Sequence, residues 1–330
     1  VSALNLFNKC PYAWYLRYIE GINNPSNIYA FVGSCVHNFI AYWIYQKTKD
    51  RRVMFYKSPE SAGKAFWRYF YEEVSKNDYI SSSYSKEDIQ RQAAYGKLCV
   101  QNYVRQNINN PRPLEIEKRF TVLMPFGLPL TLIGVIDQIR EIPLSKVSAY
   151  NTESVYDNDG SLCLNPVYSL ICLIDLKTNR AGYDAIGDNP SVAARAKAQT
   201  ELHLNLQATT YCYMIHEVSD FKGQLPVGFG WYQLGSGDLW TTTRDLKSFA
   251  ILKSNLRNFS RVLSSATCGD DYPRHPDKQN CSWCDYAEIC SEGQKLVDPT
   301  AIFEGGITVL SRPKNVGPMY KQERFKFPKK

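Results

Sequence analysis

The sequence predicts an α/β fold with additional helices, and two patterns of apolar residues support this. In some stretches apolar residues recur every three or four positions, as in amphipathic helices, and in others they alternate or run together, as in strands. In chain order these stretches give several helices, three strands, a helix, a strand and a last helix. This order indicates a single α/β domain over residues 1–330, with helical additions.

The first part of the chain, residues 1–113, is expected to be helical. Residues 31–44 carry apolar pairs four positions apart, which is typical of an amphipathic helix. Two further helix-compatible stretches follow at 61–74 and 86–108, before two prolines interrupt the pattern.

The next part, residues 114–235, is expected to form the sheet. Leu114–Val122 alternates apolar and polar residues, with Lys118 as the one exception, and a turn rich in Pro and Gly leads to a partner strand at Leu130–Ile139. Tyr168–Lys177 is an almost continuous apolar run, as expected of a buried central strand. A helix at 204–215 and a strand at 227–234 complete this part. Residues 236–295 are expected to hold a C-terminal helix and a cysteine cluster, and 296–330 a basic tail.

Composition excludes several classes of protein. Hydrophobic residues make up 44% of the 330 and charged residues 22%, which is typical of a globular chain. No apolar run approaches the roughly 20 residues of a membrane helix, and no basic-then-apolar leader opens the sequence. The net charge of +7, with 23 Tyr and 6 Trp, suits a polyanionic partner, although a charge of this size also serves solubility alone.

Two apolar strands carry carboxylates that could act in chemistry. Asp175 and Lys177 lie two positions apart, so their side chains share one face of a strand, and Asp137 follows the apolar run of another. Carboxylates on adjacent strands suit Mg²⁺ or Mn²⁺. The alternative is an Asp175–Lys177 ion pair at a sheet end, with Asp137 as a turn former.

Three polar residues on predicted helices are weaker candidates. His37 has Gly33 and Ala41 four positions to either side, which leaves room for an ion at its imidazole. Gln207 and Tyr211 share a helix face, where they could hold a phosphate or a base edge. Ordinary packing explains all three equally well.

The cysteine cluster Cys281-x2-Cys284-x5-Cys290 supplies three thiolates within one short segment. A fourth ligand is needed to close either an iron–sulfur or a zinc site. Zinc sites more often combine two short Cys-x2-Cys arms, and three unligated cysteines are the remaining reading.

Four short motifs occur in an order that resembles the RecB-type nucleases of the PD-(D/E)xK superfamily. The motifs are Gly33-x3-His37, Gly134-Val135-Ile136-Asp137, Asp175-Leu176-Lys177 and Gln207-x3-Tyr211. The resemblance implies a restriction-endonuclease-like core, which is a mixed sheet flanked by helices. The start of the chain, Leu4-x2-Phe7-x2-Cys10-Pro11, is similar to members with an iron–sulfur cluster, including CRISPR-associated and AddB-type nuclease domains.

The resemblance also implies a role for each matched residue. His37, Asp137 and Asp175 would be metal ligands, together with the backbone carbonyl of Leu176. Lys177 would orient the attacking water or stabilise charge on the phosphate. The position of the DNA strand would be set by Gln207 and Tyr211. A nitrogen ligand makes the site softer, so Mn²⁺ should work at least as well as Mg²⁺.

Cys10 becomes the fourth ligand of the cysteine cluster by this resemblance, in a C-terminal region that binds a structural [4Fe–4S] cluster together with Cys281, Cys284 and Cys290. The resemblance favours iron–sulfur over zinc. Such a cluster and the absence of a leader point to the reducing cytoplasm, or to that of a host cell if the protein is viral.

The function expected from all of this is a metal-dependent DNA nuclease, with single-stranded DNA ends as the substrate of an exonuclease. A non-catalytic iron–sulfur DNA-binding module of a larger recombination or replication complex is the alternative, and an RNA nuclease is a third. A helicase, an integrase or a replication complex could be the partner, and no membrane is expected. The spacing departs from the family at 141–168 and 178–206, two insertions expected in loops that could gate the substrate.

Overall fold

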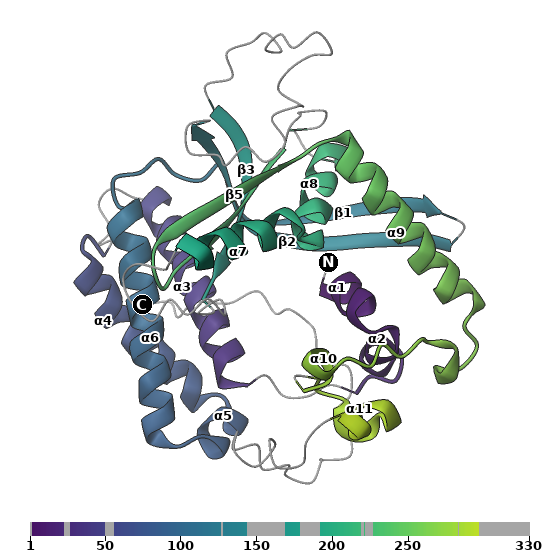
Figure 1. Ribbon diagram of the computed structural model, residues 1–330. Coiled ribbons are helices and arrows are strands. Elements are labelled where there is room, and N and C mark those ends of the chain that lie inside the picture. Colours follow the sequence, from purple (N-terminus) through teal and green to yellow (C-terminus); the bar gives the residue numbers. More distant parts are fainter. Residues whose placement is uncertain are drawn as a thin grey trace, which may run out of the picture. The chain divides into compact units, whose positions relative to one another are not determined.

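The computed structural model describes most of the chain (Figure 1). The described residues are 2–22, 27–49, 56–126, 128–143, 169–178, 192–218, 221, 227–282 and 284–296. The chain divides into two compact units. The larger unit runs from residue 25 to 264, and the smaller unit combines residues 2–24 with the region from residue 265 onward. The domain boundaries expected from the sequence stay predictions.

The larger unit is built on a mixed sheet of five strands in the order β1-β2-β3-β4-β5. The strands are β1 (Glu115–Phe126), β2 (Leu128–Pro143), β3 (Ser169–Lys177), β4 (Val227–Gln233) and β5 (Asp238–Arg244). Neighbouring strands are antiparallel except β3 and β4, which run parallel. A parallel pair needs a crossover connection, and two helices lie between these strands in the sequence. The α/β core with a mixed sheet is thus confirmed.

Helices flank the sheet of the larger unit (Figure 1). They are α3 (Ile28–Lys49), α4 (Pro59–Ser75), α5 (Asp78–Ser83), α6 (Lys86–Asn107), α7 (Val192–His203), α8 (Leu206–Val218) and α9 (Leu246–Ser265). A buried apolar cluster joins α3, α4 and α6 to β3, with Val36, Phe66 and Val100 fully enclosed. α8 packs on β1, β2 and β4. The strands β2 and β3 therefore belong to a sheet that is packed against helices.

Polar residues fix where the helices of the main core begin. Ser58 and Ser61 form a reciprocal capping box at the start of α4, and Pro59 occupies its first turn. Ser85 accepts the backbone N–H of Asp88 at the start of α6. Among the described residues no helix is both long and apolar enough to span a bilayer.

The smaller unit is made of short elements from both of its segments. They are α1 (Ser2–Lys9), α2 (Pro11–Tyr18), η3 (Gly269–Asp271), α10 (Lys278–Ser282), η4 (Ala287–Ile289) and α11 (Ser291–Leu296). Tyr15 stacks on Tyr272 with ring centroids 4.9 Å apart, and the Tyr286 hydroxyl donates to the Ile22 carbonyl at 3.0 Å. These contacts tie the two segments into one unit.

The structure corrects several expectations about the elements. β5 was missed, because its short Thr-rich run has no clear alternation. Pro143 ends β2, so the start of the expected 141–168 insertion is strand, and 144–168 lies outside the described residues. The 178–206 insertion is not all loop, since α7 occupies part of it. The basic tail lies outside the described residues from 297 onward.

Candidate functional site

The candidate site lies where β2 and β3 separate. Their ladder pairs Gln138 with Ile174 and stops there. One step further, the same register would place Asp137 directly opposite Asp175. The two carboxylates therefore stand at the point where backbone pairing ends. Asp137 lies inside the long strand β2, not at its end or in a turn, so both its expected place at a strand end and the turn-former alternative are wrong.

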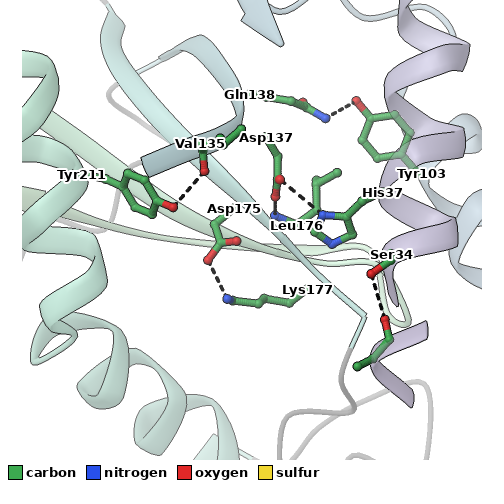
Figure 2. A network of polar contacts seen from close by, with 11 residues as sticks. Ser34, His37, Tyr103, Val135, Asp137, Gln138, Asp175, Leu176, Lys177 and Tyr211 are labelled. Carbon is green, nitrogen blue, oxygen red and sulfur yellow. Dashed lines mark hydrogen bonds and ion pairs between the residues drawn. The ribbon is translucent and has the colours of Figure 1, made fainter. Parts of the chain in front are cut away.

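Asp137 takes over the hydrogen bonding that the backbone gives up at this point. The Leu176 N–H donates to Asp137 Oδ2 at 2.6 Å, and the His37 Nδ1–H donates to Asp137 Oδ1 at a longer 3.3 Å (Figure 2). Only 14% of the Asp137 side chain is exposed. One carboxylate thus links α3, β2 and β3.

A close approach of α3 to the end of β3 brings His37 to this carboxylate. Gly33 lies one turn before His37, and a Cβ on Gly33 would come within 2.9 Å of the Thr178 hydroxyl oxygen. Burial lowers the pKa of His37, but the charge and hydrogen bond of Asp137 and the charge of Asp175 outweigh this effect. The net result is a pKa above the ordinary value for histidine.

Asp175 and Lys177 share one face of β3, as their spacing predicted. The Lys177 Nζ lies 2.6 Å from Asp175 Oδ2 (Figure 2), and the Asp175 side chain is only 12% exposed. Burial raises the pKa of Asp175, the Lys177 charge lowers it, and the Asp137 charge raises it again, so that it lies above the usual value. The Asp175–Lys177 ion pair, which the sequence offered as the alternative to a metal site, therefore exists, and it lies next to Asp137.

Tyr211 of α8 lies on the other side of Asp137 from His37 (Figure 2). The Tyr211 hydroxyl donates to the Val135 carbonyl at 2.8 Å, and the Gln207 side chain hydrogen-bonds the Tyr211 side chain. Burial, followed by the charges of Asp175 and Asp137, raises the pKa of Tyr211. All the residues predicted for the metal site and its surroundings therefore meet in the larger unit.

Glu117 is a residue of this region that the sequence interpretation missed. It lies on β1 with a φ of 47°, a backbone conformation that L-residues rarely adopt. Surrounding protein atoms and the Asp137 charge raise its pKa to about 7, against an opposing effect of His37. The one available signal was Lys118, the next residue, which breaks the alternation of the strand.

A divalent cation fits the chemistry of this donor set. Asp137 and Asp175 offer oxygens and His37 a nitrogen, which suits Mg²⁺ or Mn²⁺. Asp175 Oδ2 is buried beside the Lys177 ammonium, its ion-pair partner. In the same part of the chain no three His, Cys, Asp or Glu side chains are already gathered at ligand spacing. Ion binding would therefore replace the present His37 and Lys177 contacts.

The four predicted cluster cysteines meet in the smaller unit. Cys10, Cys281, Cys284 and Cys290 line one pocket there. Burial raises the pKa of Cys284, a backbone hydrogen bond at Tyr286 lowers it, and the nearby Cys10 and Cys281 raise it further. Cys10 precedes α2, yet its thiol does not cap that helix. The thiols of Cys10, Cys281 and Cys284 thus lie within electrostatic reach of one another.

The same pocket fits an iron–sulfur cluster in one further respect. Arg274 lines it, and the Arg274 Nε–H is buried without a hydrogen-bond partner among the described residues. Cluster sulfurs accept N–H hydrogen bonds, so an unpaired donor beside four thiols suits such a group.

Comparison with known proteins matches the chain to a family and to solved structures. The family model for the PD-(D/E)XK nuclease superfamily matches residues 1–149 and 170–291. No curated protein matches. The crystal structure of SSO0001 is 12% identical, with a TM-score of 0.29, and the alignment covers 80% of this chain and 95% of that one. A likeness this low carries no argument here.

Proposed function

The chain belongs to the PD-(D/E)XK nuclease superfamily, and on that basis we propose that it is a RecB-type, metal-dependent deoxyribonuclease. The substrate would be single-stranded DNA with free ends, cut as by an exonuclease. One observation supports this above all: α3, β2 and β3 bring His37, Asp137, Asp175 and Lys177 together where two strands separate.

Each side chain has a distinct part in the proposed reaction. Asp137 and Asp175 supply carboxylate oxygens to the cation, and His37 supplies an imidazole nitrogen. A bound Mg²⁺ or Mn²⁺ lowers the pKa of a bound water and neutralises charge on the phosphate. Once released from Asp175, the Lys177 ammonium would orient the attacking water by donating a hydrogen bond to it, or would stabilise charge on the phosphate. The Leu176 carbonyl would be a further oxygen ligand.

Tyr211 and Gln207 would position the DNA strand. Their mutual hydrogen bond and the Tyr211–Val135 contact hold the phenol beside the carboxylates. DNA carries one phosphate charge per nucleotide, so a chain of net charge +7 favours its binding.

The test is cleavage of end-labelled DNA by the purified protein with Mn²⁺. Lys177→Ala and Asp175→Asn should lower the rate by about 10²-fold or more, because each removes a group acting at the phosphate or the water. Lys253→Ala is the matched control, since Lys253 of α9 also pairs with an acid, Glu217 of α8, at 3.9 Å. Circular single-stranded DNA should stay intact.

Several results would contradict this assignment. Cutting of circular DNA would contradict the exonuclease. Cleavage of RNA but not of DNA would make RNA the substrate in place of DNA. DNA binding without any cutting would make the chain a non-catalytic module of a larger complex. Loss of the native circular dichroism spectrum in the Asp175 or Lys177 variants would make those residues structural.

The proposal extends to a structural [4Fe–4S] cluster held by Cys10, Cys281, Cys284 and Cys290, in a protein of the reducing cytoplasm. The shared pocket and the unpaired Arg274 donor support it. Four cysteines from both segments would then fasten the smaller unit together.

Anaerobically purified protein should contain about four irons and four sulfides per chain. Cys10→Ser and Cys281→Ser should lose the brown colour and most of the iron. Cys268→Ser should not, because Cys268 is exposed in the same unit and does not line the pocket. Zinc in place of iron, or iron retained by Cys10→Ser, would contradict the cluster.

A further inference from the structure

Three carboxylates form one row across three strands. The β1–β2 register pairs Ile116 with Gln138 and Lys118 with Ile136, which leaves Glu117 opposite Asp137. On the other side of Asp137, the β2–β3 register continued by one step would place Asp175. Like charges directly opposite each other on a sheet destabilise it. A row of this kind is stable when a cation lies among its members.

The backbone at Glu117 is held in an unfavourable conformation. Among the described residues Glu117 is the one non-glycine with positive φ, at 47°. Glycine adopts this conformation freely, whereas glutamate does so at a cost. Strain of this kind persists where the surrounding structure imposes it, and it gathers at functional sites.

Among the described residues, Glu117 is near the proposed metal ligands and has no Lys or Arg as an ion-pair partner. Asp137 and His37 both act on its charge. Its neighbour Lys118 pairs with Glu115 at 3.3 Å instead. In the part of the chain that the structure describes, Glu117 forms no ion pair with Lys or Arg.

We propose that Glu117 supplies a further carboxylate oxygen to the divalent cation at His37, Asp137 and Asp175. This rests on the proposed function, because it assigns one more ligand to that site. The register brings Glu117 opposite Asp137, and the Asp137 charge acts on the Glu117 carboxylate. Mg²⁺ and Mn²⁺ take several oxygen ligands, so the added carboxylate completes a shell that two aspartates leave open.

The test measures Mn²⁺ affinity by titration calorimetry or electron paramagnetic resonance, without any nuclease assay. Glu117→Gln should weaken Mn²⁺ binding by about 10-fold or more, since it removes a charged oxygen ligand. Glu115→Gln is the matched control on the same strand and should bind as the wild type does. Glu117→Gly should weaken binding equally but raise Tm by about 2 °C, because glycine relieves the strain.

Two results would overturn the proposal. One is equal Mn²⁺ affinity of Glu117→Gln and Glu115→Gln. The other is wild-type Mn²⁺ affinity in Glu117→Gly, because the carboxylate would then have been removed without effect on binding. A wild type that binds Mn²⁺ yet cuts no DNA contradicts the nuclease alone, so the two failures are distinguishable.

Discussion

Buried charged side chains in the larger unit form hydrogen bonds with backbone groups and neighbouring side chains. Asp137 accepts the Leu176 N–H that strand pairing no longer uses. Arg244 is 5% exposed and has no carboxylate within ion-pair distance among the described residues. Its guanidinium donates instead to carbonyls at the end of α7, including His203 at 2.8 Å, and to Thr209 at 2.7 Å. The negative end of a helix dipole favours a cation there.

Replacing Arg244 should therefore destabilise the larger unit strongly. Arg244→Met leaves several buried carbonyls without a donor, at a cost of about 3 kcal/mol in the free energy of unfolding. Arg244→Lys should recover only part of this, because an ammonium cannot match the planar fork. Urea unfolding checks both variants. An Arg244→Met protein as stable as the wild type would show that the carbonyls find other donors.

At the scale of elements, the contact between α3 and the end of β3 sets the position of His37. Gly33 allows the approach, and Thr178 fills the space where a Cβ would lie. The Tyr95 hydroxyl of α6 donates to the Thr178 carbonyl at 2.6 Å, which fixes the other side of this contact. Gly33 of α3 and Tyr95 of α6 thus both contact Thr178, the residue that follows β3, and Gly33 lies one helical turn before His37.

Gly33→Ala should push α3 away from β3. Overpacking costs about 1–3 kcal/mol, and the better helix propensity of alanine returns about 1 kcal/mol, so a net loss of up to about 2 kcal/mol in stability is expected. Mn²⁺ affinity should fall with it, since His37 moves. The double variant Gly33→Ala/Thr178→Ala should restore both, because the hydroxyl is gone. Tm measures the stability of the variants, and Mn²⁺ titration measures their affinity for the metal. A double variant that recovers neither quantity would contradict this account of the α3–β3 contact.

At the scale of the whole molecule, the sequence predicted the α/β core with a mixed sheet, and the roles of the site residues stay predictions. The long helices and the central strand have strong periodicity, so local pattern was enough for α3, α6 and β3. Asp175 and Lys177 were placed on one face correctly, because a strand has a period of two. The order of the motifs indicated the superfamily, and the family model confirms the superfamily.

What the sequence could not predict depends on strand pairing. Asp137 lies within β2 because that strand continues past it to pair with β3, and register between strands leaves no mark in a single segment. Glu117 was counted as one more outward-facing polar residue of an alternating strand. Its positive φ and its place opposite Asp137 exist only in the assembled sheet. The buried environment of Arg244 likewise comes from α7 and α8.

The smaller unit joins residues 2–24 to the region from residue 265 onward, with the entire larger unit between them. During synthesis the first helices leave the ribosome long before their partners exist. Domains fold largely as units while the chain is made, so the sheet with its helices is complete first. The opening segment, whose Ala13 and Leu16 pack with Tyr286, can complete its core only after the region from residue 265 onward has been made. Contacts so distant along the chain form slowly, which makes this unit the final step of folding and the one most exposed to chaperones.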